Sequence, residues 1–485
     1  MKRILSVFLF LLLLPVCSAV RAEESSPYGY VARLTPDGAS DIPAFITIGD
    51  KSTAEQYLRE GIISYYEINY PVSLPEEIVT GPEQTGVSLF STGYWQHTAI
   101  NLPAPSGGGS GIRVGILDSG VNPHADFGSR LLTGYNVLTE TTDTSDNIGH
   151  GTRVAGMVAS TSIGIAPGAE IYPVKCFDAG KDTYVIDILN AMQNAIDNGC
   201  DILNMSLGFT GFGSDTQLYQ SFTDLISHAD RNDILIVTAV GNDANKGNPT
   251  YYPAGLSGVI GVGAVSQSSS AASGYTRASY SEYNDTVDIV APGNCVGAPD
   301  KDGDSDYVTT SDTQHVNGTS FACPMIAGIL ALGLSTRPDK DPHIVADALL
   351  LSARDLGDSG WDAEYGFGLA DVTAFLAELE RTDRTHVSRT AMYTNPDGTV
   401  QDGLVVYNAG ETPFTLHGAS YCTKGTPELT GLLTVTASHG YTLVLVTNMT
   451  VFIWNKMLPA AAPRKIETPA VTGSGMAVFC STPIQ

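Results

Sequence analysis

The 485-residue sequence predicts an α/β fold with a doubly wound, mostly parallel sheet, preceded by a short α+β unit and followed by a small all-β domain. Three observations predict this. Between residues 93 and 380, apolar runs of strand length alternate with segments of helical spacing. Ahead of them, strand-like runs surround one helical segment. From residue 381 onward helical spacing disappears, so we expect units at 23–92, 93–380 and 381–485.

Residues 1–22 have the pattern of a cleaved signal peptide. Lys2 and Arg3 precede an apolar run at 4–14, and small residues follow. Export is therefore expected, which makes the protein secreted. A lipoprotein signal ending at Cys17 is the alternative, and the bulky residue before that cysteine disfavours it.

Composition narrows the classes of partner. A net charge of −26 disfavours nucleic acid and anionic membranes. The most apolar later stretch, 441–458, is interrupted by polar residues, so it predicts two strands and no transmembrane span. We expect a monomer.

Six cysteines remain after the leader. Three lie in apolar or small-residue runs, which predicts buried thiols at Cys176, Cys200 and Cys323. Cys422 with Cys480 is a candidate bridge in the tail. No Cys and His spacing predicts a zinc site.

The elements of the first two units follow from their patterns. In the N-terminal unit we expect strands at 28–34, 45–48 and 62–72 and a helix at 54–59. In the larger unit we expect strands at 112–118, 171–174, 202–206, 234–240, 259–265 and 287–291. Helices are expected there at 185–198, 217–231, 325–334, 342–352 and 369–379.

Three polar residues stand where this fold places its sites. Asp118 ends an apolar strand, at the edge where open α/β sheets bind ligands. His150 follows a polar loop and begins a helical pattern. Ser320 precedes the helix at 325–334, and Pro324 between them is tolerable only in a first turn. Ser320 is therefore expected at a helix N-terminus, where dipole and free amide groups favour negative charge.

These side chains are the parts that a serine hydrolase needs. The imidazole takes the proton of the serine, and the carboxylate holds the imidazole in the right tautomer. Asn242 follows the run 234–240 and is a candidate donor to the oxyanion. Taken alone, each residue also has a purely structural interpretation. Asp118 or Ser320 would be a helix cap, His150 a buried core residue and Asn242 a residue of a left-handed turn.

The chain resembles the subtilisin-like serine peptidases, the subtilase family, across 93–380. The resemblance rests on five motifs in family order: Asp118-Ser119-Gly120, His150-Gly151-Thr152, Ser206-Leu207-Gly208, Gly241-Asn242 and Gly318-Thr319-Ser320.

The resemblance implies a role for each motif. Ser320 would be the nucleophile, His150 the general base, Asp118 the group that orients it and Asn242 the oxyanion donor. Ser206, Leu207, Gly208 and Gly241 would bind substrate, with an extended peptide pairing as an added strand; a plain strand end is the alternative for the first three. Protein or peptide substrates are implied, and the unit at 23–92 would be the chain's own propeptide.

The family's chemistry requires no cofactor, but structural calcium is common in it. The usual calcium-binding insertion after His150 is absent here. An acidic loop instead spaces carboxylates at alternate positions, with Asp300, Asp302, Asp304 and Asp306 as candidate ligands. A solvated run of charges is the alternative.

Tyr251 falls where relatives often have a small residue at the floor of the specificity pocket. A bulky floor would favour short side chains, and an outward-facing loop tyrosine is the alternative.

Two functions remain open from sequence. The first is an active secreted endopeptidase that works through an acyl-enzyme. The second is a binding protein built on an inactive subtilase scaffold, which the intact triad disfavours. A lipase or esterase of the α/β-hydrolase type is disfavoured because no Gly-x-Ser-x-Gly surrounds Ser320.

Overall fold

The structure is a computed structural model. It describes residues 26–36, 42–74, 95–103, 107–210, 220–256, 258–294, 296, 298–299, 316–358 and 362–380, together with the backbone of a short strand at 307–308 and of strands between 385 and 467. The expected leader at 1–22 and the candidate metal loop at 300–306 lie outside the described residues.

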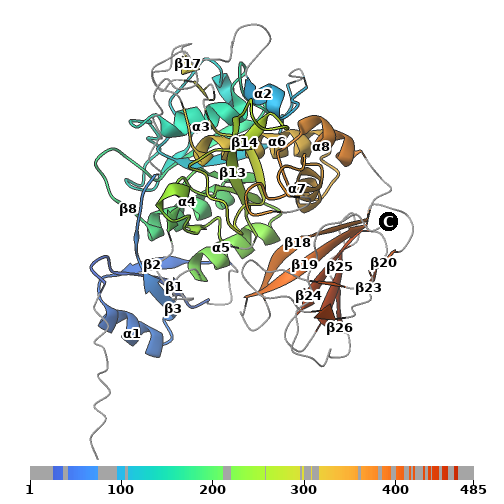
Figure 1. Cartoon of the computed structure of the whole chain (residues 1–485). Coiled ribbons are helices and arrows are strands. Elements are labelled where there is room, and N and C mark those ends of the chain that lie inside the picture. The colour runs from blue at the N-terminus through green and yellow to red at the C-terminus, as the bar shows by residue number, and fades with distance from the viewer. Residues whose placement is uncertain are drawn as a thin grey trace, which may run out of the picture.

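A mostly parallel sheet forms the centre of the chain (Figure 1). Its order is β14-β13-β11-β9-β5-β7-β6, and β15 also pairs with β13. All pairs are parallel except that of β13 with β14. The strands are β5 (Arg113–Asp118), β6 (Tyr135–Asn136), β7 (Glu170–Lys175), β9 (Ile202–Met205), β11 (Leu235–Ala239), β13 (Ile260–Gln267), β14 (Tyr275–Arg277) and β15 (Ile289–Pro292).

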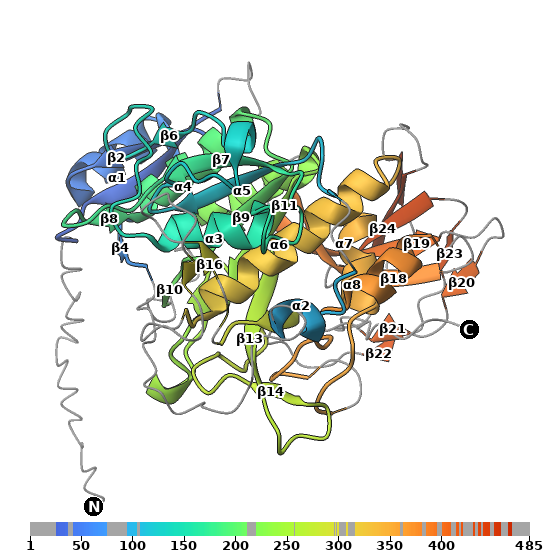
Figure 2. The ribbon, with the colours of Figure 1, turned by 90° about the horizontal axis from the view of Figure 1, so that it is seen from above.

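Helices cover both faces of the sheet, as expected for a doubly wound fold (Figure 2). One apolar core joins the sheet to α3, α6, α7 and α8, and a second joins it to α4 and α5. Because both faces are buried, the central strands are mostly apolar, as in β11 with its single polar residue Thr238. The helices are α2 (Trp95–Ala99), α3 (His150–Ala159), α4 (Val185–Asp197), α5 (Gln220–Arg231), α6 (Thr319–Thr336), α7 (Pro342–Leu351) and α8 (Val372–Leu379), with 3-10 turns η1 (Gly128–Arg130) and η2 (Ala244–Lys246).

Within the described part of the chain, α6 is the one helix long and apolar enough to cross a membrane. Of its apolar window, 89% is buried inside the protein, which is the environment of a core helix. Cys323 in this helix, together with Cys176 and Cys200, is a buried free thiol, as predicted.

The N-terminal unit is a small sheet of order β2-β1-β3 with one helix against it (Figure 1). It has its own core, which includes Tyr30, Ile48 and Ile63. Its elements are β1 (Tyr30–Leu34), β2 (Phe45–Ile48), α1 (Lys51–Arg59) and β3 (Ile63–Ile68). The chain then continues as β4 (Pro71–Val72), which pairs antiparallel with β8 (Thr183–Tyr184).

The C-terminal segments are described as strands only. A sheet of order β18-β19-β24-β25-β26 lies beside α5 and α7 (Figure 1). Two strands cover the stretch at 441–458, as expected, whereas the run expected at 476–479 lies outside the described residues. The strands are β18 (Thr385–Thr394), β19 (Val400–Asn408), β20 (Phe414–Leu416), β21 (Ala419–Ser420), β22 (Thr430–Gly431), β23 (Val435–Ala437), β24 (Gly440–Val446), β25 (Val451–Lys456) and β26 (Arg464–Glu467).

Candidate active site

The carboxyl edge of the sheet gathers the candidate catalytic side chains. Asp118 is the last residue of β5, which lies between β7 and β9, where the direction of strand addition reverses. Ser206 follows β9 and Asn242 comes shortly after β11. The parallel arrangement therefore brings distant segments of sequence to one edge.

Asp118 and His150 form a buried pair. The Nδ1 atom of His150 lies 2.8 Å from Oδ1 and 2.9 Å from Oδ2 of Asp118. The side chain of His150 is 2% exposed and that of Asp118 is 0% exposed. A carboxylate can only accept, so Nδ1 carries the proton, and in the neutral ring Nε2 is left as the basic nitrogen.

A carboxylate that the sequence analysis did not single out, Asp146, holds the turn before His150. It is buried and accepts five hydrogen bonds of 2.7 to 3.1 Å. The donors are Ser119 Oγ, the amide groups of Ile148 and Gly149, and both the amide and the hydroxyl of Thr152. An acidic residue in a polar loop has no periodic signal, so only its contacts reveal this role.

The same network ties the start of α3 to the end of β5. Ser119 Oγ donates to Asp146 and accepts from the amide of Gly151 at 2.9 Å. A Cβ on Gly151 would lie 2.1 Å from the carbonyl oxygen of Gly120. Glycine after His150 is therefore required for the helix to begin this close to the strand.

Helix α6 begins earlier than expected, which corrects the prediction that it starts at Met325 with a first-turn proline. It starts at Thr319, so Pro324 lies inside the helix. Proline has no amide hydrogen, so the carbonyl of Ser320, four residues earlier, loses its helical donor. The hydroxyl of Ser206 donates to that carbonyl at 2.7 Å instead.

Ser320 is the second residue of α6, at the helix N-terminus as expected. Its own Oγ donates to the carbonyl oxygen of Ser206 at 3.3 Å, so the two serines are bonded in both directions. Helix α3 packs on α6, and the ring of His150 lies 5.4 Å from that of Phe321, the next residue. The fold thus places His150 beside the first turn of α6, the turn that carries Ser320.

Asn242 faces the first turn of α6. Its Oδ1 accepts from both the amide and the hydroxyl of Thr319 at 2.9 Å. Its Nδ2 lies 3.2 Å from the position of a Cβ on Gly318. With the oxygen held by Thr319, the amide nitrogen lies beside the backbone that leads into Ser320, where a donor to an oxyanion belongs.

The predicted substrate edge already carries a strand of the chain itself. Gly208 forms an antiparallel bridge with Ser73, which directly follows β4. Leu207 is fully buried in the second core, so its backbone rather than its side chain is available at this edge. An extended segment, here one of the chain's own, therefore pairs with this edge as an added strand.

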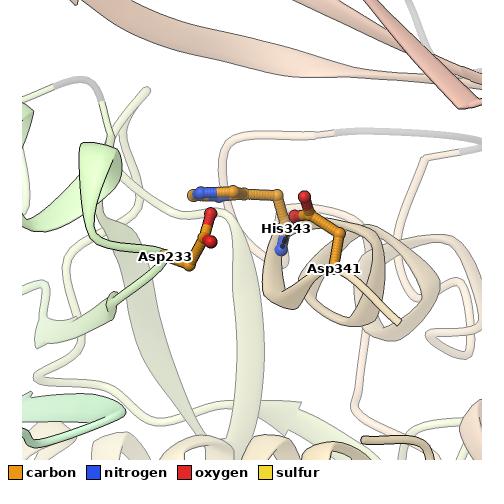
Figure 3. Close-up of side chains that lie close together, drawn as sticks. All are labelled: Asp233, Asp341 and His343. Atoms are coloured by element: carbon orange, nitrogen blue, oxygen red, sulfur yellow. Dashed lines mark hydrogen bonds between the residues drawn. The ribbon is translucent and has the colours of Figure 1, made fainter. Parts of the chain in front are cut away.

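Three side chains of the types that bind cations, Asp233, Asp341 and His343, lie close together (Figure 3). One ligand atom from each of Asp233, Asp341 and His343 lies within 4.8 Å of the others. Asp341 also caps α7 by accepting from the amide of His343, and the ring of His343 lies 3.5 Å from Asp230. Although burial acts to lower the pKa of His343, Asp230 and the other carboxylates raise it above its usual value. The imidazolium that this favours competes with a metal ion for the same carboxylates.

Comparison with known proteins gives the family. A model described as the subtilase family matches residues 109–368, more than half of the chain. The minor extracellular protease Epr of Bacillus subtilis (strain 168) is 30% identical over 349 residues, which are 69% of this chain and 50% of that protein. This chain therefore spans half the length of Epr. Subtilisin DY of Bacillus licheniformis is 35% identical over 275 residues, 55% of this chain and 91% of that protein.

A solved structure shares the fold. Fervidolysin from Fervidobacterium pennivorans, described as a keratinolytic enzyme related to subtilisin, matches with a TM-score of 0.64 at 20% identity. The match covers 94% of this chain and 77% of that one. The sequence matches confirm what the motif order predicted, and the chain belongs to the subtilase family of serine endopeptidases.

Proposed function

We propose that the chain is a secreted endopeptidase that hydrolyses peptide bonds through Asp118, His150 and Ser320, with Asn242 as oxyanion donor. The observation that carries the proposal is the buried contact of His150 Nδ1 with both oxygens of Asp118, at 2.8 and 2.9 Å. That contact serves a general base whose tautomer must be fixed.

Acylation follows from these positions. Ser320 Oγ attacks the carbonyl carbon of the scissile bond while Nε2 of His150 takes its proton. The oxyanion accepts hydrogen bonds from Asn242 Nδ2 and from the amide of Ser320 at the start of α6. His150 then gives the proton to the leaving nitrogen, and the carbon–nitrogen bond breaks. An ester on Ser320 and a free amine are formed.

Deacylation repeats the cycle with water. His150 removes a proton from water, the hydroxide attacks the ester carbon, and the proton returns to Ser320 Oγ as the acid leaves. Throughout, the Asp118 carboxylate stabilises the imidazolium without taking its proton.

We further propose that the N-terminal unit is the inhibitory propeptide. Its Arg33 and Tyr65 each lie 2.6 Å from Asp224 on α5. Glu67 accepts from the hydroxyl of Ser221 at 2.7 Å and from amide groups at the start of the same helix. Because Ser73 bridges to Gly208, the segment after β3 occupies the edge that a substrate would use.

The test compares the full chain, allowed to mature, with a Ser320→Ala variant. Casein hydrolysis and covalent labelling by a fluorophosphonate are measured on both. The proposal expects both signals from the unmodified chain and neither from the variant. A folded, matured chain that is inert in both assays would favour the binding-scaffold alternative instead.

A further inference from the structure

The side chain that precedes the scissile bond, the P1 side chain, has a restricted place on this molecule. The bridge between Ser73 and Gly208 marks the line of an extended peptide. Ser320 contacts Ser206, two residues before Gly208. On the other side, the amide of Gly241 lies 3.3 Å from the hydroxyl of Thr319, next to Ser320. A P1 side chain directed away from Ser320 therefore enters between Gly208 and Gly241, a region we name the P1 site.

The ring of Tyr251 occupies the P1 site. A Cβ on Gly241 would lie 2.4 to 2.8 Å from three atoms of this ring, and one on Gly208 would lie 2.9 Å from a fourth. Tyr251 is 9% exposed, so it is not an outward-facing loop residue. The two glycines leave room for the tyrosine ring, and the ring takes the room that a large P1 side chain would need.

Two contacts hold Tyr251 in this position, and a third holds its partner Asp243. Tyr251 lies in β12 (Tyr251–Tyr252), which pairs with β10 (Phe209–Thr210) directly after Gly208. Its hydroxyl donates to Asp243 Oδ2 at 2.5 Å. The other oxygen of Asp243 lies 2.9 Å from Lys246 Nζ.

A buried side chain, Glu282, also holds the backbone of Asp243. Its amide donates to Oε1 of Glu282 at 2.8 Å, and Glu282 is fully buried. Because Asp243 directly follows Asn242, this bond fixes the loop that carries the candidate oxyanion donor as well as the partner of Tyr251. With its oxygens bonded to Tyr251 and Lys246, Asp243 is not free to pair with a basic P1 side chain.

We propose that Tyr251 closes the P1 site, so that the enzyme cleaves after glycine, alanine and serine and rejects aromatic, long aliphatic and basic residues. Tyr251 is the specificity-determining residue, and Asp243 and Glu282 are positioning residues that act through it. The proposal rests on the proposed peptidase function and specifies the substrates of that same site.

The experiment measures kcat/KM of the matured enzyme on peptides that differ only in the P1 residue, alanine, leucine, phenylalanine or lysine. The unmodified enzyme is expected to have a kcat/KM for alanine at least about tenfold higher than for phenylalanine. A single methylene group that does not fit a pocket already changes kcat/KM by about 10-fold or more. Tyr251→Gly is expected to reverse the ratio by raising kcat/KM for phenylalanine. Tyr251→Phe keeps the ring but loses the hydroxyl that donates to Asp243. The preference for alanine over phenylalanine should therefore become smaller without reversing.

Two controls keep the readout specific. Tyr172→Phe removes a hydroxyl that donates to Asn194 on α4, outside the P1 site, and should leave the P1 profile unchanged. Fluorophosphonate labelling gives the active fraction of each preparation, and the ratio of two substrates on one preparation does not depend on that fraction.

An unmodified enzyme that cleaves after phenylalanine as well as after alanine would overturn the proposal even if Tyr251→Gly failed to fold. So would an active Tyr251→Gly enzyme with the original ratio. Absence of labelling in the matured, unmodified chain would be a different result, because it would overturn the peptidase function on which this inference rests.

Discussion

Replacing Asp146 by alanine tests whether the turn before His150 is fixed by a single buried carboxylate. The change removes the acceptor of five hydrogen bonds, three from backbone amide groups and two from hydroxyls. Amide groups cannot turn away without moving the backbone, whereas the hydroxyls of Ser119 and Thr152 can rotate. The three amide groups therefore dominate the cost.

The expected loss of unfolding free energy is about 3–5 kcal/mol. A hydrogen bond to a charged group contributes about 1.5–3 kcal/mol net, and bonds that share one carboxylate are not additive. The turn leads directly into His150, and a displacement of about 1 Å at a catalytic group costs about 100-fold in rate. We expect kcat to fall by about that factor, with KM changed far less.

Urea unfolding, measured in a Ser320→Ala background to prevent self-cleavage, gives the change in unfolding free energy. Peptide hydrolysis in the otherwise unmodified chain gives kcat. Asp143→Ala is the matched control, because the carboxylate of this exposed acid in the same loop accepts from the amide and hydroxyl of the neighbouring Ser145 and from no residue of the catalytic turn that the structure describes. If Asp146→Ala matched this control in both stability and kcat, the reasoning about the turn would be wrong.

Three further predictions concern buried charge, the N-terminal unit and core packing. Burial raises the pKa of Glu282 from 4.5 to about 8. The pKa of Glu282 is higher in the folded chain than in the unfolded chain. The unmodified chain therefore loses stability as the pH rises from 4.5 to about 8. The Glu282→Gln variant should therefore gain, relative to the unmodified chain, up to about 1.4 kcal/mol per pH unit in urea unfolding, and a constant difference would contradict this. Glu67→Ala removes the bond to Ser221, so amide hydrogen exchange at the start of α5 should accelerate in the full chain, whereas Glu60→Ala, an exposed change on the same unit, should have no effect. Gly328→Val would place a Cβ 2.8 Å from a core isoleucine, which should cost about 1–3 kcal/mol and lower Tm, and an unchanged Tm would argue against close packing there.

Local patterns were sufficient for most elements of the central fold. The expected strand 202–206 and helix 342–352 agree with β9 and α7 within about a residue. The bounds of both elements can be read from sequence. The strand coincides with a mostly apolar run, and α7 begins with Asp341 as its cap and Pro342 in its first turn. The start of α6 was missed because Pro324 usually marks a first turn. Here a side chain from another segment, Ser206, supplies the missing hydrogen bond.

Sequence was enough to predict the family, the α/β class and the candidate triad, because each of Asp118, His150 and Ser320 lies in a short motif whose meaning is local. The residues that surround them become known only from the folded chain. The five hydrogen bonds of Asp146 and the bond from the Asp243 amide to the buried Glu282 join segments that no period or spacing relates. A buried polar group must find a hydrogen-bond partner wherever the fold provides one, and that partner's place in the sequence is arbitrary.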